Sequence, residues 1–544
     1  MSRTPLFRQL RRALRLAQHS LTTGEPPDEV VERAREARRH LSRRHFLGLS
    51  SAAVATVALQ GCTPLFTRSR RSDDPVLIIG AGIAGLSAGY RLCLAGVPVR
   101  IIEAQDRTGG RMLSLRDYFA DGQVAELGGE LVDTNHLHMH ALARELGIEF
   151  NDLSEDDPEK DEVYFFEGQR YSEAEVVEAF LPVARRIREA LAELEGDGDV
   201  TWAEPLNGQR LDRMSIAEWL DSAEVTGWIR TLLDVAYTTE YGLEMDRQSA
   251  LNFLLMIDPD PDPTGPFHIF GESDERFHVR GGNDLITRAL AERVEDALEL
   301  ETRLEAVRIR SDGHFVTSLR RGETSFEVSA RHLVLALPFT LLRQVRLDLD
   351  LPPVKRRAIE ELGYGTNAKL MVGFSHRVWR SEYDSNGATL SDLPFQLTWE
   401  TSRLQPGGAG ILTNFTGGEH GVEVGRGTPA EQAAALVADL DRIYPGIRDT
   451  RDGMREARFH WPSHPWTLGS YASYLPGQWT GFRGQEGTPV GRLYFAGEHC
   501  SPEAQGFMEG GLETGEAAAA EILGDLGLPP QVAVHRPRRS VQVA

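Results

Sequence analysis

A scarce residue type marks one position in this chain for chemistry. Three lysines stand among 56 arginines in the 544 residues: Lys160, Lys355 and Lys369. Lys369 lies in the apolar run Ala368–Phe374, which is typical of a buried strand. Burial disfavours an ammonium and moves a lysine towards its neutral, proton-accepting form. Lys369 is therefore a candidate for proton transfer; the alternative is a packed stem whose head reaches water.

A glycine-rich turn is the second chemical feature. In Gly80-Ala81-Gly82-Ile83-Ala84-Gly85, the first glycine permits a tight turn and the second lets backbone amides approach a pyrophosphate. The third lets a helix and a strand pack closely. Glu103, 18 residues after Gly85, is placed to accept hydrogen bonds from ribose hydroxyls. The turn predicts a dinucleotide site, with a glycine turn that binds nothing as the alternative.

The elements that position this turn form a βαβ unit. An apolar strand is expected over Val76–Ile79, a helix over 84–95 and a second strand over 97–102, directly before Glu103. The predicted fold class is therefore α/β, with a Rossmann-like domain.

Further motifs follow along the chain. The turn Arg107-Thr108-Gly109-Gly110-Arg111 is rich in donors that suit phosphate oxygens. The others are Gly128-Gly129-Glu130, Arg280-Gly281-Gly282, the strand 301–309 around Val307, the strand 333–338, Gly497-Glu498-His499, and Gly506-Phe507-Met508-Glu509. Together, over about residues 75–525, they resemble the FAD-dependent amine oxidase family of monoamine oxidases, polyamine oxidases and L-amino acid oxidases.

The resemblance implies a bound FAD and the residues that hold it. They are Gly80, Gly82, Ile83, Ala84, Gly85, Glu103, Ala104, Arg107, Gly110, Arg111, Gly128, Gly129, Glu130, Val307, Trp466, Gly497, Glu498, Gly506, Phe507 and Met508. Ser470 stands where covalent members carry a cysteine, and Cys500 does not match that position, so non-covalent FAD is expected. A helix over 511–522 would direct its N-terminus at the electron-rich side of a reduced flavin.

The same resemblance implies the catalytic groups. It places Lys369 near flavin N5 through a water molecule, and it places Tyr471 and Phe507 as aromatic faces that orient the amine. Phe507 departs from the more common tyrosine, which would make the cage less polar. Core packing is the alternative for Tyr471, Phe507 and Trp466.

The implied reaction is oxidation of a primary or secondary amine to an imine, then to aldehyde and ammonia, with O₂ reduced to H₂O₂. Leu131 is apolar where amino acid oxidases carry a carboxylate-binding arginine, which favours an amine as the substrate.

Asp133 is a weaker candidate for an amine contact; the favoured interpretation is an N-cap of a helix over 135–146. Glu130 either faces the flavin or satisfies backbone amides. An L-amino acid oxidase, an oxidase or desaturase of an apolar substrate, and a non-catalytic FAD-binding protein remain alternatives.

The motifs divide the chain into an FAD-binding domain interleaved with an α+β substrate domain. FAD-binding segments are expected at 75–150, 266–345 and 466–525, and substrate segments at 151–265 and 346–465. The first substrate segment is helical by pattern, over 174–195 and 215–237; the second mixes the strand 368–374 with a helix over 429–443. Residues 526–544 read as a loose tail. No metal site is predicted.

The front of the chain has a separate role. Residues 1–71 hold 14 Arg and 5 acids, so the remainder of the chain carries −22 − 9 = −31. This charge argues against a nucleic-acid partner.

Arg43-Arg44 followed by an apolar stretch over 46–59 resembles a twin-arginine export signal, within residues 1–62. The apolar stretch is too short to span a membrane. The run ending in Cys62 resembles a lipoprotein cleavage box, with a cut near 55–58 as the alternative. The predicted partner is the twin-arginine export machinery, and the predicted location is the periplasm or a lipid anchor at the membrane surface.

Overall fold

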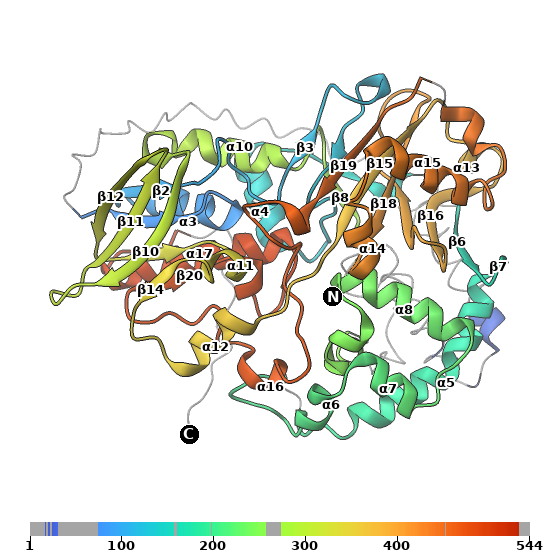
Figure 1. Ribbon diagram of the computed structural model, residues 1–544, viewed down its shortest axis with the longest axis horizontal. Helices are drawn as coiled ribbons and strands as arrows, with labels where there is room; N and C mark the ends of the chain where they lie inside the picture. Colours follow the sequence, from blue (N-terminus) through green and yellow to red (C-terminus); the bar gives the residue numbers. More distant parts are fainter. Residues whose placement is uncertain are drawn as a thin grey trace, which may run out of the picture.

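The computed structural model describes residues 17, 20, 21, 24, 26–30, 74–156, 160–196, 199–256, 274–451 and 453–531. They form two lobes side by side (Figure 1). No helix within these ranges is long and apolar enough to cross a membrane. The predicted export motif, the apolar stretch after it and Cys62 lie outside the described residues.

The first lobe is built on a five-stranded parallel sheet in the order β20-β13-β1-β2-β9. Its strands are β1 (Val76–Ile79), β2 (Val99–Ile102), β9 (Leu298–Glu299), β13 (Leu333–Leu335) and β20 (Leu493–Phe495). Helices α3 (Ile83–Leu94), α10 (Asp284–Arg293) and α17 (Met508–Asp525) cover one face. A four-stranded sheet covers the other: β10 (Thr302–Ile309), β11 (Phe315–Arg321), β12 (Thr324–Ala330) and β14 (Arg346–Asp348). Strand β1 is buried on both faces, as its continuous apolar sequence predicts.

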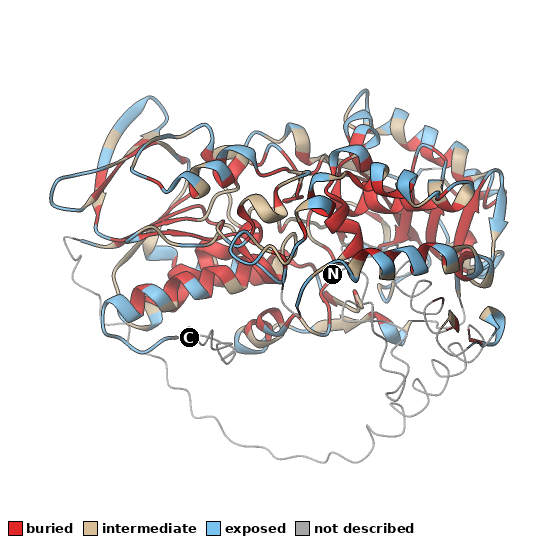
Figure 2. Cartoon of the chain, turned by 90° about the horizontal axis from the view of Figure 1, so that it is seen from below, coloured by how far each residue is buried: buried red, intermediate tan, exposed pale blue. Residues whose placement is uncertain are grey.

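The second lobe contains a seven-stranded sheet in the order β19-β15-β18-β17-β16-β6-β7. The strands are β6 (Asp161–Phe166), β7 (Gln169–Tyr171), β15 (Ala368–Phe374), β16 (Ser385–Ser391), β17 (Leu397–Glu400), β18 (Gly410–Thr416) and β19 (Glu456–His460). On one face lie α5 (Glu173–Leu191), α7 (Ile216–Ser222), α8 (Trp228–Tyr241) and α9 (Ala250–Leu254). On the other lie α13 (Val378–Ser381) and α15 (Pro429–Leu440). The buried faces of strands and helices meet inside each lobe (Figure 2).

Shorter elements complete the two lobes. They are β3 (Ser114–Leu115), β4 (Ala125–Glu126), α4 (Leu137–Leu146), β5 (Phe150–Asp152), α6 (Gln209–Arg213), β8 (Phe277–Val279), α11 (Phe339–Leu342), α12 (Pro353–Glu361), α14 (Gly418–Glu423) and α16 (Trp479–Phe482). The α/β fold class is confirmed.

Two local expectations differ from the structure. The helix expected over 215–237 is two helices, α7 and α8, separated at Gly227, whose φ of +75° does not continue a helix. The segment expected to be mainly helical also contributes β6 and β7 to the large sheet.

Asp133 does not cap α4, so that interpretation is wrong. The helix begins at Leu137, and the Asp133 carboxylate accepts the backbone amide of Glu275 (2.7 Å). The first amides of α4, at His138 and Met139, donate instead to the Glu509 carboxylate from α17 (2.9 and 2.8 Å). The helix is therefore capped from another element, far away in the sequence.

Candidate active site

A cavity of about 760 Å³ is lined by residues of both lobes. Most of the residues predicted from the sequence line it: Gly80, Gly82, Ile83, Ala84, Glu103, Ala104, Gly110, Arg111, Gly128, Gly129, Glu130, Lys369, Trp466, Tyr471, Gly497, Glu498, Gly506, Phe507 and Met508. Three predicted residues do not: Gly85, Arg107 and Val307.

The glycine turn leaves one end of this cavity open beside a helix terminus. A Cβ on Gly82 would meet no atom within 4 Å, so its missing side chain leaves room for a ligand. Helix α3 begins at the next residue, and no side chain caps it, so its first amides are available to an anion. In contrast, a Cβ on Gly85 would lie 1.9 Å from the carbonyl oxygen of Gly80. Gly85 therefore closes the contact between helix and turn rather than facing the cavity.

Glu103 stands at the end of β2, beside this opening. Its carboxylate accepts the backbone amides of Ala81 (2.8 Å) and Gln105 (2.9 Å). Burial raises the pKa of the Glu103 carboxyl, and the two amides oppose the rise. Because each carboxylate oxygen has a second lone pair, the group can still accept a hydroxyl from the cavity side. An open glycine, an uncapped helix terminus and a fixed acceptor together fit the diphosphate and ribose of FAD.

An ion pair joins three of the predicted segments. The Arg111 guanidinium donates to Glu498 Oε1 (2.8 Å) and to the carbonyl oxygen of Ser470 (2.7 Å). Glu498 Oε2 accepts the amide of Gly506 (2.8 Å), at the start of the loop that leads into α17. These hydrogen bonds hold the three segments of the cavity wall together.

The two other predicted residues outside the cavity shape its surroundings. Arg107 donates to the carbonyl oxygens of Thr108 (3.2 Å) and Gly110 (3.0 Å), which stabilises its own turn. Val307 is buried between the two sheets of the first lobe, and the preceding residues of β10, 302–305, line the cavity instead. A strand's sequence pattern does not say which end of the strand meets a ligand.

Lys369 lies on β15, lines the cavity at its second-lobe end and is 4 % exposed. Its ammonium donates to Glu130 Oε2 (2.7 Å), to the carbonyl of Gly128 (2.9 Å) and to the carbonyl of Glu126 (3.2 Å). Each of its three hydrogens therefore has an acceptor. One of these acceptors is a carboxylate and the other two are backbone carbonyls.

Glu130 lines the cavity, and its carboxylate is bound by side chains of the second lobe. Its Oε1 atom accepts the Trp399 indole (2.9 Å) and the Thr401 hydroxyl (2.9 Å), and its Oε2 atom accepts Lys369. Burial alone would raise the pKa of the Glu130 carboxyl, but the Lys369 ammonium and these hydrogen bonds lower it. Among the described residues, no backbone amide donates to the Glu130 carboxylate, so the expectation that it satisfies backbone amides is wrong.

Aromatic side chains form the walls at this end. The Tyr471 hydroxyl donates to the carbonyl of Glu240 (2.7 Å), which fixes the ring. Phe507 precedes α17, and its ring packs edge-on against His136 at 4.9 Å between centroids. Ser470, where a covalent link to flavin would need a thiol, donates to Asn367 Oδ1 (2.6 Å).

Sequence reasoning missed two residues of these walls, Trp399 and Phe415. Phe415 pairs directly with Lys369 across β18 and β15, so both side chains lie on one face of the sheet. The period-two pattern of β17 could have shown that Trp399 shares a face with Leu397, but not which face meets the cavity.

The charges of the lining residues are paired. The cations among them are Arg111, Arg303 and Lys369, and their partners are Glu498 (2.8 Å), Glu305 (3.1 Å) and Glu130 (2.7 Å). Among the described lining residues, each of these three cations therefore already has a carboxylate partner.

Comparisons with known proteins agree with this geometry. Residues 83–523 match the family model described as flavin-containing amine oxidoreductase. The L-amino acid dehydrogenase of Synechocystis sp. is 27 % identical over 83 % of this chain and 95 % of its own. Amine oxidase B of Sus scrofa is 26 % identical over 85 % of this chain and 88 % of its own. The structure of cyclohexylamine oxidase from Brevibacterium oxydans superposes with a TM-score of 0.72 at 24 % identity, over 84 % of this chain and all of that one (100 %).

The match covers both lobes and the cavity segments from Ile83 onwards. The chain belongs to the flavin-containing amine oxidoreductase family, and it is an FAD-dependent oxidoreductase that acts on amines.

Proposed function

We propose that this enzyme oxidises a primary or secondary amine to an imine, while O₂ is reduced to H₂O₂. Water converts the imine to an aldehyde and ammonia, or to an aldehyde and a primary amine when the substrate is a secondary amine. The observation that carries the proposal is the pairing of every described cation in the cavity beside aromatic walls. A substrate carboxylate would have to share a cation with one of these carboxylates, which is costly. Residues 257–273, outside the described ranges, contain no Arg or Lys.

The residues that would hold FAD follow from the cavity. The open side of Gly82 and the first amides of α3 would receive the diphosphate, and Glu103 would receive the ribose hydroxyls. Bound without a covalent link, FAD would supply the acceptor for a pair of electrons. Acid denaturation of the holoenzyme should leave all the flavin in the supernatant; flavin on the precipitated chain would contradict this.

The side chains at the substrate end position and shield the amine. Tyr471 and Phe507 would present aromatic faces to a neutral amine and exclude water, with the Tyr471 hydroxyl tied back to Glu240. The Lys369 ammonium places a fixed positive charge where negative charge develops. It can also hold a proton for transfer through a water molecule.

One set of relatives favours a second candidate, an L-amino acid oxidase or dehydrogenase. The Synechocystis relative is named L-amino acid dehydrogenase, and the Pseudechis australis relative, 23 % identical, is named L-amino-acid oxidase. The paired cations argue against it, because a substrate carboxylate would lie beside a carboxylate that is already in place at each of them.

One experiment separates the candidates. Purified, FAD-loaded protein is mixed anaerobically with primary amines, secondary amines, polyamines and L-amino acids, and flavin absorbance is followed. Bleaching by amines alone, with H₂O₂ formed after O₂ is admitted, supports the proposal. Bleaching by amino acids alone establishes the second candidate, and no bleaching by any of them favours an apolar substrate. An absence of H₂O₂ after amine bleaching would assign the electrons to another acceptor.

For location, we infer export by the twin-arginine machinery, with a periplasmic or lipid-anchored product. The support is the Arg43-Arg44 motif, the apolar stretch after it and Cys62. Cell fractionation of the wild type and of an Arg43→Lys/Arg44→Lys variant tests this: the variant should stay in the cytoplasm. Equal distributions would contradict it.

A further inference from the structure

We propose that Glu130 is a positioning residue that holds Lys369 as an ammonium and fixes the Trp399 indole at the substrate end of the cavity. The effect of Glu130 on turnover rests on the proposed function, whereas the dependence of the Lys369 charge on Glu130 does not. The three side chains come from the loop after β4, from β15 and from β17, and all line the same cavity.

The Glu130 carboxylate accepts three hydrogen bonds from side chains of the second lobe. It receives Lys369 on one oxygen at 2.7 Å, and Trp399 and Thr401 on the other, both at 2.9 Å. At 8 % exposure, water adds little to this set. The loop of the first lobe is thereby fastened to two strands of the second.

Lys369 depends on this carboxylate for its charge. Its other two acceptors, the carbonyls of Gly128 and Glu126, are neutral. The ammonium also lies 5.2 Å from the centroid of the Trp399 ring, where the aromatic face attracts a cation. Without Glu130, a lysine that is 4 % exposed would keep two dipoles and one ring but no counter-charge, and desolvation would favour its neutral form.

Trp399 depends on it for orientation. The indole nitrogen donates to Glu130, and the ring contributes to the cavity wall beside Phe415, at 5.3 Å between centroids. One carboxylate therefore sets both a charge and a wall of the substrate chamber.

The rarity of lysine allows a direct test of the charge. In protein labelled at lysine Cε with ¹³C, the folded chain has three signals to follow with pH, from Lys160, Lys355 and Lys369. In Glu130→Gln, which keeps the shape of the side chain, the Lys369 signal should titrate at least one pH unit lower than in wild type. Lys160 and Lys355 serve as internal references and should not move. An unchanged Lys369 titration in folded Glu130→Gln would overturn the inference.

Two further variants keep the test decisive. Thr401→Val removes one donor to Glu130 but leaves the charge pair, so the Lys369 titration should stay as in wild type. If Glu130→Gln does not fold, Glu130→Asp keeps the charge but shortens the reach, and the Lys369 signal should shift in the same direction by a smaller amount. An unshifted Glu130→Asp signal would then overturn the inference.

A flavin readout that needs no amine completes the test. The holoenzyme is reduced by light with an external donor, and its reoxidation by O₂ is followed across pH. Glu130→Gln should reoxidise about tenfold more slowly near neutral pH, as expected when a charge aimed at developing negative charge is lost. The loss should shrink at lower pH, where Lys369 regains its proton, and Thr401→Val should follow the wild type. A slower rate with no pH trend would assign Glu130 a structural role only. Failure of the amine panel with these shifts intact would remove the proposed substrate and leave this inference standing.

Discussion

Two lysines are buried in this protein, and they allow a controlled test of what a buried charge does at the cavity. Lys369 faces the cavity, whereas Lys355, at 1 % exposure, donates to the carbonyl of Glu486 (2.7 Å) and lies 4.1 Å from the centroid of Phe495. Lys369→Met should keep FAD bound but slow reoxidation of the reduced enzyme by O₂ about 100-fold, the usual cost of losing a preorganised electrostatic group.

Stopped-flow absorbance measures this rate, and the visible flavin spectrum reports whether FAD stays bound. Lys355→Met is the matched control: it should lower thermal stability but leave reoxidation within about twofold of wild type. Equal rates in Lys369→Met and wild type would remove the lysine from the chemistry.

At this scale, the sequence predicted the lysine but not its partner. Lys369 could be found because its residue type is rare and its segment is apolar. Glu130 lies 239 positions before Lys369 in the sequence. It accepts hydrogen bonds from Lys369 on β15, from Trp399 on β17 and from Thr401 directly after β17. Only the folded arrangement brings these donors together, so no local pattern could indicate what the carboxylate does.

Among the elements, the glycine turn offers two neighbouring substitutions with opposite expected effects. Gly85→Ala places a methyl group 1.9 Å from the Gly80 carbonyl, so it should destabilise the apoprotein by about 3 kcal/mol, the upper end of the usual overpacking cost. Gly82→Ala meets nothing within 4 Å, so the apoprotein should keep its melting temperature while the cavity loses room for FAD. Thermal melts and FAD titration by fluorescence separate the two. Equal melting temperatures for both apoproteins would contradict the packing argument.

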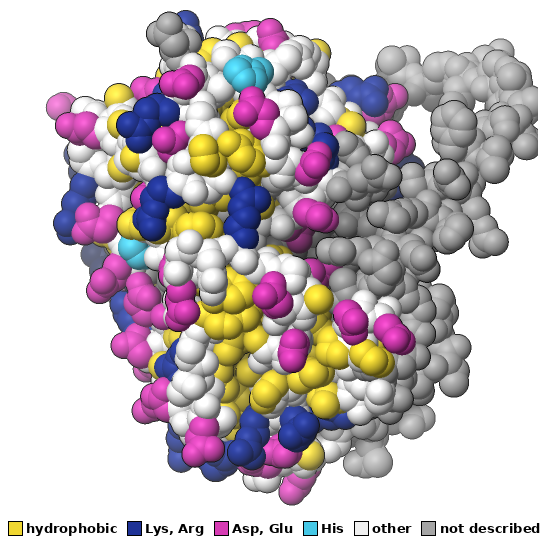
Figure 3. Space-filling model, turned by 90° about the vertical axis from the view of Figure 1, so that its right-hand side faces the viewer, with side chains coloured by type: hydrophobic (Ala, Val, Ile, Leu, Met, Phe, Trp, Pro, Cys, Tyr) yellow, Lys and Arg dark blue, Asp and Glu magenta, His cyan; other side chains and the backbone are white. Residues whose placement is uncertain are grey.

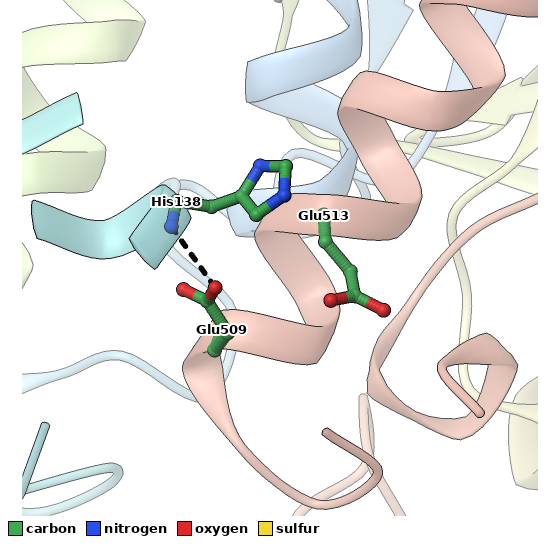
Figure 4. A group of neighbouring side chains, drawn as sticks. All are labelled: His138, Glu509 and Glu513. Carbon is green, nitrogen blue, oxygen red and sulfur yellow. Dashed lines mark hydrogen bonds between the residues drawn. The ribbon is translucent and has the colours of Figure 1, made fainter. Parts of the chain in front are cut away.

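A second element-scale prediction concerns the contact between α4 and α17, where His138 lies near Glu509 and Glu513 (Figure 4). Their ligand atoms lie within 4.8 Å of one another, yet each side chain is already engaged. His138 Nδ1 is 2.7 Å from Glu516, Glu509 accepts two α4 amides, and Glu513 accepts Ser501 (2.8 Å). Arg91 joins Glu516 and Glu145 at the same contact. The cluster is therefore interpreted as a helix clamp.

The clamp should make stability depend on pH. Burial alone would lower the pKa of His138, but Glu516 and the neighbouring acids raise it. A raised folded-state pKa gives stability that is complete below the unfolded value, about 6.5, and is lost as pH rises through the folded value. The destabilisation caused by His138→Gln should therefore be about 1 kcal/mol at pH 5.5 and shrink towards pH 9.

Denaturant unfolding at several pH values measures this difference. His140→Gln is the control with the opposite sign, because burial lowers the pKa of His140. Its stabilising contribution is present above the unfolded value and is lost as pH falls. A flat His138→Gln difference over this range would refute the clamp as a charged contact.

Predictions of elements were correct where a local sequence pattern determines the element. They were wrong where tertiary contacts determine it. Strands β1 and β15 have the predicted bounds, because continuous apolar runs suit strands that are buried in a sheet. The capping of α4 by Glu509 could not be predicted, since the cap comes from a helix more than 360 positions later. The helical periodicity over 215–237 also continues across Gly227, so it did not predict the break between α7 and α8.

In the molecule as a whole, the cavity exists because distant segments of the chain meet. Strands from the segments 75–150, 266–345 and 466–525 form the five-stranded sheet, and strands from 151–265 and 346–465 form the seven-stranded one. The loop 363–367 is fastened to the loop 470–473 by backbone hydrogen bonds, including Gly365 to Tyr471 (2.9 Å). Family motifs located the first lobe, because a nucleotide turn demands fixed residues, whereas the walls of the second lobe follow no such rule.

The front of the chain raises a question about the finished enzyme. Ala17 and Val30, which precede the predicted export motif, are 0 % and 1 % exposed, and both belong to the apolar core of the helical part of the second lobe. Figure 1 shows the short dark-blue piece beside α5, and Figure 3 shows that hydrophobic side chains gather on the lower half of this side of the molecule. A cut anywhere near 55–62 would remove both residues from the core.

We therefore expect the folded enzyme to be less stable without its first 31 residues. Losing the burial of Val30 alone costs about 1.5–3 kcal/mol, so deletion of 1–31 should lower the melting temperature by several degrees. Val30→Asp should reproduce much of this loss, whereas Asp28→Ser, at an exposed position, should not. Intact mass of the protein recovered from its own cells then decides between two outcomes. A chain that keeps residues 17–30 has a front segment that is part of the fold. A chain cut after the export motif, melting like the full-length protein, would show that the contact of Ala17 and Val30 with the core contributes no stability.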